Sequence, residues 1–218
     1  MPRESKKSKL ARVLEVCERM DALYPAARTA LDYEGAFGLL IAVILSAQTT
    51  DVAVNQVTPE LFRRWPDAAS LANADAAELS DVIHSIGFFN VKARNCIEAA
   101  RLLVSEFGGE VPASMAELVL LPGVGRKTAN IVLNHAFGVV EGIAVDTHVY
   151  RIAHRLRFVS SGSDTPDKVE KDLLGLLPRE LWGETNQRWV LFGRDFCQAR
   201  KPRCAECPLV DLCPSRQL

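Results

Sequence analysis

Two amphipathic helical patterns meet at a proline and two glycines in the middle of the chain, and this break constrains the fold more than any other segment. The first pattern begins after Ser114, which has the spacing of a capping box, and Pro122 stops it. The second pattern begins at Arg126 and is expected to end at Gly138. Its apolar residues recur at helical spacing, at Ala129, Val132, Leu133, Ala136 and Phe137. The sequence therefore predicts a helical hairpin whose turn is Gly123-Val124-Gly125.

A hairpin of this kind offers a binding site for an anion. Backbone N–H groups at the start of a helix have no intrahelical acceptor, and a DNA phosphate suits them. The candidate phosphate ligands are Gly123, Val124, Gly125 and Arg126. The alternative is an ordinary helical hairpin whose glycines only make the turn, and the hairpin pattern alone does not separate these two interpretations.

Lys127 and Asp146 form the candidate catalytic pair. Lys127 lies in the first turn of the second predicted helix, where the macrodipole disfavours a cation, and a neutral lysine amine is a nucleophile. Asp146 precedes a further helical pattern and is a candidate N-cap. A capping carboxylate stays ionised, so it could stabilise a developing positive charge or accept a proton from an attacking amine. Taken singly, Lys127 is a solvated surface lysine and Asp146 a plain helix cap.

Two further polar residues are candidates for supporting this pair. Asn130 falls on the same polar helical face as Lys127, and His148 stands two residues beyond Asp146. The other three histidines are expected to be surface or packing residues.

Four of the six cysteines cluster with the spacing C-x6-C-x2-C-x5-C, at Cys197, Cys204, Cys207 and Cys213. The sequence has no signal-peptide pattern, so we expect reduced thiols rather than disulfides. Four thiolates in one short segment suit a single metal centre, and spacing alone leaves zinc and a four-iron cluster equally open. The other two, Cys17 and Cys96, fall within helical patterns and are expected to be buried.

The loop between the first two clustered cysteines carries three basic residues, Arg200, Lys201 and Arg203. A basic loop held by a metal centre can lie along a DNA backbone. The alternative is solvated charge, which is the usual meaning of a short basic run.

Leu121–Lys127 and Ala144–His148 resemble the endonuclease III family of helix-hairpin-helix DNA glycosylases, and the resemblance extends over nearly the whole chain. It implies that Lys127 attacks the sugar C1′ while Asp146 assists. It also implies a [4Fe–4S] cluster at the four clustered cysteines, because this spacing is the family's.

Two other segments resemble the parts of this family that enter the DNA helix, since a flipped base leaves a gap that must be filled. Leu45–Asp51 resembles the segment whose glutamine fills that gap, which indicates Gln48. Ile86–Asn90 resembles the wedge loop, where a leucine commonly stands at the position of Phe88. A phenylalanine stacks better on a base but is bulkier, and could alter opposite-base preference. The alternatives are a capped helix end for Gln48 and core packing for one of Phe88 and Phe89.

Helical periodicity dominates the chain and strand alternation is nearly absent, which predicts an all-α fold. The resemblance implies two helical domains with a DNA cleft between them. Residues 29–140 would form a six-helix domain containing the helix-hairpin-helix motif at about 113–138. Residues 1–28 and 141–218 would form a discontinuous iron–sulfur cluster domain.

Two local features complete the expected organisation. The apolar run Gly35–Leu45 is predicted to be a core helix, because a membrane span needs about 20 apolar residues. The basic start of the chain, Pro2–Lys9, is expected to be disordered.

The resemblance implies a bifunctional DNA glycosylase and AP lyase that removes oxidised pyrimidines, such as thymine glycol, and cuts the strand 3′ to the lesion by β-elimination. Two alternatives are a monofunctional glycosylase of the same fold, of the adenine-mismatch type, and a non-catalytic iron–sulfur DNA-binding protein. The net charge of −1 gives no global basic field. We expect a cytoplasmic monomer that binds duplex DNA containing a damaged base or abasic site, without membrane contact.

Overall fold

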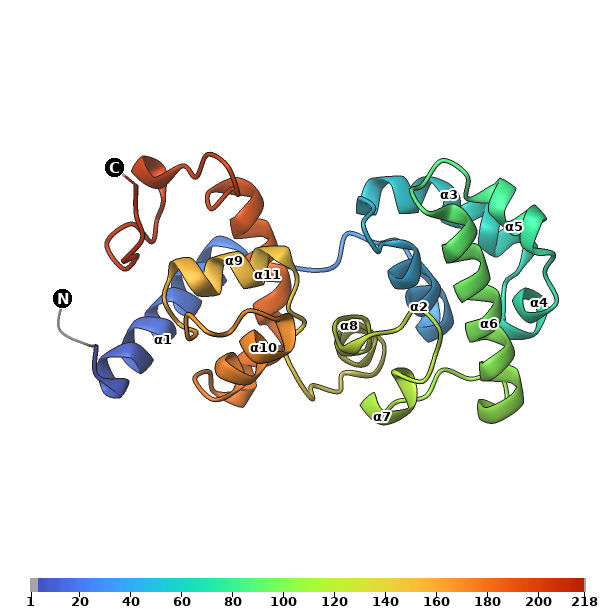
Figure 1. The fold of residues 1–218 in the computed structure, drawn as a ribbon, viewed down its shortest axis with the longest axis horizontal. Helices are drawn as coiled ribbons and strands as arrows, with labels where there is room; N and C mark the ends of the chain where they lie inside the picture. Colours follow the sequence, from blue (N-terminus) through green and yellow to red (C-terminus); the bar gives the residue numbers. More distant parts are fainter. Residues whose placement is uncertain (1–3, 218) are drawn as a thin grey trace. The chain divides into compact units, whose positions relative to one another are not determined.

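The computed structural model describes residues 4–217, and these fold into eleven α-helices and two short 3₁₀ helices without a β-strand. The all-α prediction is therefore confirmed over the described part of the chain. The helices form two compact units (Figure 1). One unit is the continuous segment Ala30–Glu141, and the other combines Met1–Thr29 with Gly142–Leu218.

The continuous unit contains seven helices, one of which is buried at its core. Its helices are α2 (Gly35–Leu45), α3 (Asp51–Arg64), α4 (Ala68–Ala72), α5 (Ala76–Val82), α6 (Phe89–Phe107), α7 (Met115–Leu118) and α8 (Arg126–Phe137). Every residue of α2 from Gly38 to Leu45 is buried, which confirms the predicted core helix. Helix α2 packs against α3, α6 and α8, and α6 also packs against α4 and α5. Burial of this apolar surface is the main stabilising contribution to the unit.

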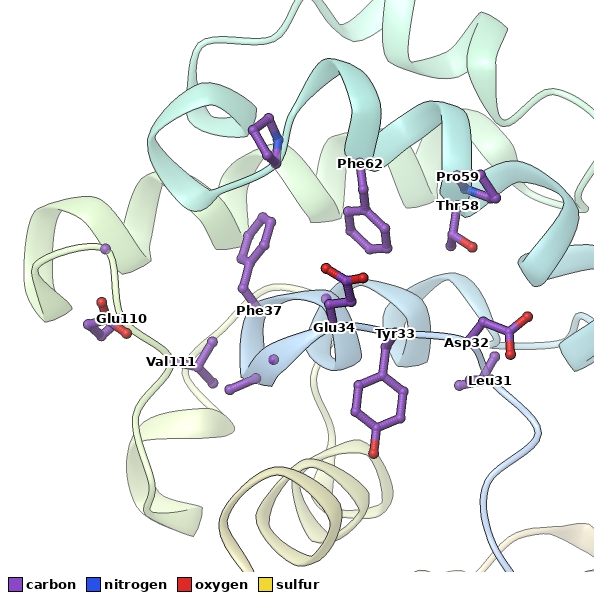
Figure 2. A pocket seen from close by; sticks show the side chains of 15 residues that line it. Leu31, Asp32, Tyr33, Glu34, Phe37, Thr58, Pro59, Phe62, Glu110 and Val111 are labelled. Carbon is purple, nitrogen blue, oxygen red and sulfur yellow. The ribbon is translucent and has the colours of Figure 1, made fainter.

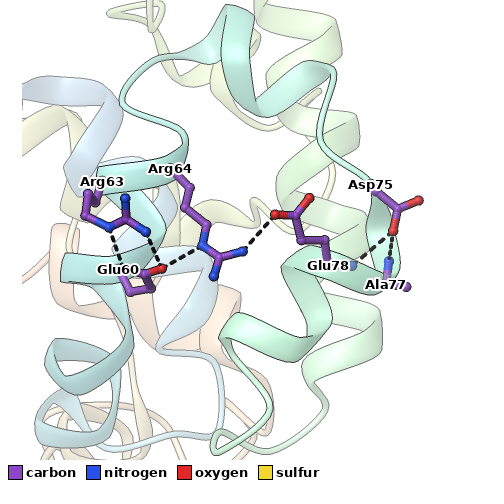
Figure 3. A network of polar contacts seen from close by, with 6 residues as sticks. All are labelled: Glu60, Arg63, Arg64, Asp75, Ala77 and Glu78. Atoms are coloured by element: carbon purple, nitrogen blue, oxygen red, sulfur yellow. Dashed lines mark hydrogen bonds and ion pairs between the residues drawn. The ribbon is translucent and has the colours of Figure 1, made fainter.

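Polar contacts join α3 to α5 on the surface of this unit (Figure 3). Asp75 caps α5 by accepting hydrogen bonds from Ala77 N and Glu78 N at 2.9 and 3.0 Å. The Glu78 carboxylate pairs with Arg64 of α3 at 2.7 Å. Arg64 also pairs with Glu60. Exposed pairs such as these each stabilise a fold by only about 0–1 kcal/mol, so their contribution is small beside that of the buried core.

The discontinuous unit joins the first helix of the chain to its last segments. Its elements are α1 (Lys6–Leu23), α9 (Thr147–Arg155), α10 (Pro166–Leu174), η1 (Arg179–Leu181), α11 (Trp182–Asp195) and η2 (Cys204–Glu206). Arg12 of α1 donates a hydrogen bond to Leu156 O at 2.8 Å and stacks over the Phe158 ring at 4.7 Å. Arg19, two turns further along α1, donates to Pro208 O at 2.9 Å. These contacts explain why segments distant in sequence form one unit.

The expectation of a disordered basic start is wrong for residues 6–9. Ser5 caps α1 by accepting a hydrogen bond from Ser8 N at 3.1 Å, and the helix begins at Lys6. Val13 and Val16, further along the same helix, are fully buried, so core packing extends the helix back through its polar first turn. Residues 2 and 3 of that predicted tail lie outside the described residues. No described helix is both long and apolar enough to cross a membrane.

Candidate DNA-contacting and catalytic site

The predicted hairpin forms, and both its turn geometry and its packing require glycine at position 123. Gly123 has a φ of 79°, in the left-handed region that favours glycine. A Cβ there would lie 3.0 Å from Asn95 Nδ2 and 3.2 Å from Ile44 Cγ2. Helix α8 then begins at Arg126 and ends at Phe137, with Gly138 as its C-cap, as predicted. The helix before the turn is only four residues long, because the chain turns at residues 119–123.

The turn presents backbone rather than side chains at the start of α8. Gly125 is the N-cap residue, and no side chain caps this end of the helix. The first N–H groups of α8 also have no intrahelical acceptor, as at the start of any helix. Val124 buries its side chain and can offer only its backbone to a ligand. Such a group of N–H donors at the positive end of a helix is suited to a phosphate.

Lys127 is exposed on the first turn of α8, immediately after these donors. Among the described residues of its own unit, no carboxylate lies within ion-pair distance of its amine. Asn130, one turn further along the helix, is buried. The structure therefore leaves the lysine side chain accessible and places Asn130 in the helix packing beneath it.

Asp146 is the N-cap of α9, as the sequence indicates. Its Oδ1 atom accepts hydrogen bonds from both His148 N and Val149 N, each at 2.8 Å. Within the described residues of the discontinuous unit, the second carboxylate oxygen has no hydrogen-bond partner. One oxygen therefore serves the helix while the other is available to a ligand.

His148 is held beside this cap by α11. Its Nδ1 lies 3.0 Å from Arg151 Nη2, and burial lowers the pKa of His148, while Asp146 raises it. A Cβ on Gly193 of α11 would lie only 2.5 Å from that ring nitrogen. The ring consequently packs against the glycine backbone, which supports a neutral imidazole in a fixed orientation.

Each of the two segments predicted to enter DNA contains a strained, exposed residue. Gln48 and Phe88 are exposed and have φ values of 53° and 59°, in the left-handed region that non-glycine residues rarely adopt. Such a conformation costs about 1–3 kcal/mol and concentrates at functional sites. Phe88 is 65% exposed at the N-cap of α6, whereas Phe89 packs against the core. Of the two phenylalanines, Phe89 is thus the one used for packing.

The four clustered cysteines line one pocket together with apolar residues of α9 and α11. A [4Fe–4S] cluster takes four thiolates, and the four cysteines of this pocket supply that number. Burial raises the pKa of the Cys207 and Cys213 thiols, and the neighbouring cysteines raise it further, so cluster binding must displace protons. The residues present therefore fit a [4Fe–4S] cluster.

Two arginines of α9 hold the first cysteine of this pocket. Arg155 Nη1 donates to Cys197 Sγ at 3.3 Å and to Gln198 O at 2.7 Å. Arg151 Nε donates to Cys197 O at 2.9 Å. These arginines were not among the residues predicted from the sequence, although their four-residue spacing on the helix after Asp146 places both on one face.

The basic loop between the first two of these cysteines divides into two kinds of residue. Arg200 and Lys201 are exposed. Arg203 instead pairs with Glu206 and lies over the Phe196 ring at 5.9 Å. Arg203 is exposed as well, but its pairing with Glu206 helps to shape the loop.

A cavity of about 780 Å³ lies in the continuous unit and has the wrong charge for a phosphate. Asp32, Glu34 and Glu110 line it, with the Glu34 carboxylate beside the Phe37 and Phe62 rings (Figure 2). Carboxylates repel DNA, so this cavity does not belong to a nucleic-acid site.

Two sequence families match this chain. The HhH-GPD superfamily of base excision DNA repair proteins matches residues 41–179, and the iron–sulfur binding domain of endonuclease III matches residues 197–213. Endonuclease III of Synechocystis sp. is 50% identical over 210 residues, covering 96% of this chain and 95% of that protein. Endonuclease III of Escherichia coli (strain K12) is 42% identical over 207 residues, covering 95% and 97%.

Solved structures agree with these matches. A trapped endonuclease III–DNA covalent intermediate has a TM-score of 0.90 and 41% identity, covering 98% of this chain and 97% of that chain. A thermostable thymine-DNA glycosylase, at 24% identity and a TM-score of 0.78, shares the fold.

Proposed function

The chain belongs to the endonuclease III family, and from this we propose that it is a bifunctional DNA glycosylase and AP lyase of base excision repair. Its substrates are oxidised pyrimidines, such as thymine glycol, and abasic sites in duplex DNA. The observation that carries the proposal is the exposed Lys127 amine, placed on the first turn of α8 beside the hairpin N–H donors. It acts as a monomer on chromosomal DNA in the cytoplasm.

Lys127 supplies the nucleophile. Its neutral amine attacks C1′ of the damaged nucleotide, and the glycosidic bond breaks as the base leaves with the bonding electron pair. The amine loses its proton and the sugar ring opens to give a Schiff base. The iminium then acidifies the C2′ proton, and loss of that proton expels the 3′ phosphate by β-elimination.

Asp146 assists base release. Because Oδ1 is occupied by the helix cap, the second oxygen is the one that stabilises positive charge developing on the sugar or accepts the amine proton. His148 and the buried Asn130 support the two catalytic residues by packing rather than by direct chemistry.

The remaining candidates bind the duplex. We assign Gln48 to the space left by the flipped base and Phe88 to the wedge, because both are exposed on strained loops. The hairpin Gly123, Val124, Gly125 and Arg126 binds a phosphate, and the loop Arg200, Lys201 and Arg203 follows the backbone.

The four cysteines Cys197, Cys204, Cys207 and Cys213 would hold the cluster. When bound, the cluster supplies structural cross-linking of the loop and a redox centre. Base release itself rests on the chain's own residues.

Borohydride trapping on three duplexes tests this proposal. The duplexes carry thymine glycol, an abasic site or no lesion. We expect the wild-type protein to form a covalent adduct on the first two and none on the third. Lys127→Ala should abolish both adducts. Lys168→Ala removes another exposed lysine, one that pairs with Asp164, and should leave both adducts unchanged.

Each other outcome has a distinct meaning. Undiminished trapping by Lys127→Ala would refute the lysine assignment. Base release without an adduct would identify a monofunctional glycosylase, and binding without any product would identify a non-catalytic DNA-binding protein.

A further inference from the structure

A buried lysine lies between the two segments that we assign to the interior of the duplex. Lys92 is the fourth residue of α6, and its side chain is only 4% exposed. Its Nζ donates a hydrogen bond to Thr49 Oγ1 at 2.5 Å. Across the described residues, no carboxylate lies within ion-pair distance of this amine.

This placement is unfavourable for stability. An ammonium that is removed from water without a counter-charge is costly, and the first turn of a helix is the end where a cation is disfavoured. Burial accordingly lowers the pKa of Lys92. An apolar side chain of the same length would fill the space at lower cost, so the amine must contribute something other than stability.

The contact that the amine makes is next to Gln48. Thr49 Oγ1 accepts from Lys92 and lies 3.4 Å from Ala47 O, to which its hydroxyl donates. These two hydrogen bonds therefore connect Lys92 to both chain neighbours of Gln48, Thr49 directly and Ala47 through the Thr49 hydroxyl. Gln48 is held with a φ of 53°, a strained conformation that needs such support.

The same helix also carries the wedge and touches the hairpin. Phe88 is the N-cap of α6, and its carbonyl accepts a hydrogen bond from Lys92 N at 3.0 Å. Asn95, one turn beyond Lys92, packs against Gly123 of the hairpin. One turn of α6 thus contacts all three segments that we assign to DNA.

We propose that Lys92 is a positioning residue for base extrusion, whose hydrogen bond to Thr49 holds Gln48 in register with Phe88. This inference rests on the proposed function. It makes a separable claim, because Lys92 matters only where a base must be replaced within a duplex. A single-stranded abasic site needs no such replacement, so Lys127 chemistry there is independent of Lys92.

The test compares Lys92→Met and Thr49→Val with wild type on two substrates. One is a thymine glycol duplex, assayed for base release under single turnover. The other is a single-stranded abasic oligonucleotide, assayed by borohydride trapping. We expect duplex base release to fall roughly tenfold in each variant, the effect of losing one charged hydrogen bond. Trapping on the single strand should stay within about twofold of wild type.

Four controls distinguish positioning from damage to the fold. Lys92→Met should melt at the wild-type temperature or above it, because an apolar side chain replaces a buried cation. Thr49→Ser keeps the hydroxyl and should restore duplex activity. Arg101→Met removes another cation of α6, one that donates to Ala72 O at 3.0 Å, and should leave duplex activity unchanged. The double variant Lys92→Met/Thr49→Val should be no slower than either single variant.

The outcomes separate the two proposals. Absence of wild-type base release from the duplex, together with absence of wild-type trapping on the single strand, would refute the proposed function. Normal wild-type trapping with unchanged duplex base release in Lys92→Met would refute only the role of Lys92. An equal loss on both substrates would also refute it, because that result indicates general damage.

Discussion

Two substitutions at Asp146 should separate its role as a helix cap from its role as a charge. The cap uses one oxygen, Oδ1, which accepts from His148 N and Val149 N. Asparagine retains an equivalent oxygen and is as good an N-cap as aspartate, so Asp146→Asn should shift the melting temperature by no more than about 1 °C. Asp146→Ala loses both bonds. It should cost about 1 kcal/mol, or about 2–4 °C for a chain of this size.

Base release should follow the charge rather than the cap. Both variants lack the second carboxylate oxygen, so both should release thymine glycol from the duplex about 10²–10³-fold more slowly than wild type. Thermal melting followed by circular dichroism and single-turnover base release measure the two effects on the same preparations. Base release by Asp146→Asn at the wild-type rate would refute the electrostatic role of Asp146. A melting loss in Asp146→Asn as large as in Asp146→Ala would refute the reasoning about the cap.

Three further predictions follow from packing, burial and metal binding. Gly123→Ala should destabilise the chain by about 1–3 kcal/mol and weaken duplex binding, because the φ of 79° and the nearby Asn95 side chain oppose a Cβ at this position. An unchanged melting temperature, with unchanged duplex affinity in a fluorescence anisotropy titration, would contradict this. Burial lowers the pKa of His135 from its usual value of 6.5, so the unfolded chain binds more protons than the folded chain at mildly acidic pH. The free energy of unfolding should therefore fall as the pH drops below about 6.5. In denaturant titrations, His135→Gln should make the free energy of unfolding less dependent on pH. Cys204→Ser should lower bound iron well below about four per chain and reduce duplex affinity, measured by iron analysis and anisotropy, whereas full iron content would exclude this cysteine as a ligand.

Features set by local chemistry were the ones that the sequence could predict. The apolar run Gly35–Leu45 and the C-cap Gly138 lie within a single element, and periodicity or glycine chemistry is enough to place them. The cap at Asp146 is local in the same way. The roles of Lys127 and Asp146 came instead from family resemblance, because each residue alone has an ordinary structural explanation.

Features set by tertiary contacts could not be predicted. Arg203 stands in a basic run, yet it pairs with Glu206 and Phe196 once the loop folds back. Lys92 gives no signal in sequence, because its partner Thr49 is 43 residues away. The start of the first helix could not be located from its polar first turn, since packing in the discontinuous unit extends the helix back to Lys6.

The contacts of α1 set the order in which the chain can be assembled during synthesis. Residues 30–141 leave the ribosome as one uninterrupted unit and can fold at once, since domains generally fold as units during synthesis. Helix α1 is made first, but its partners Leu156 and Pro208 are made long afterwards. Until those partners are synthesised, the apolar face of α1 stays exposed, and α1 is then the segment most accessible to chaperones and proteases. Loading of the metal centre is then a late maturation step, and starvation for iron should leave chains whose first helix is preferentially digested.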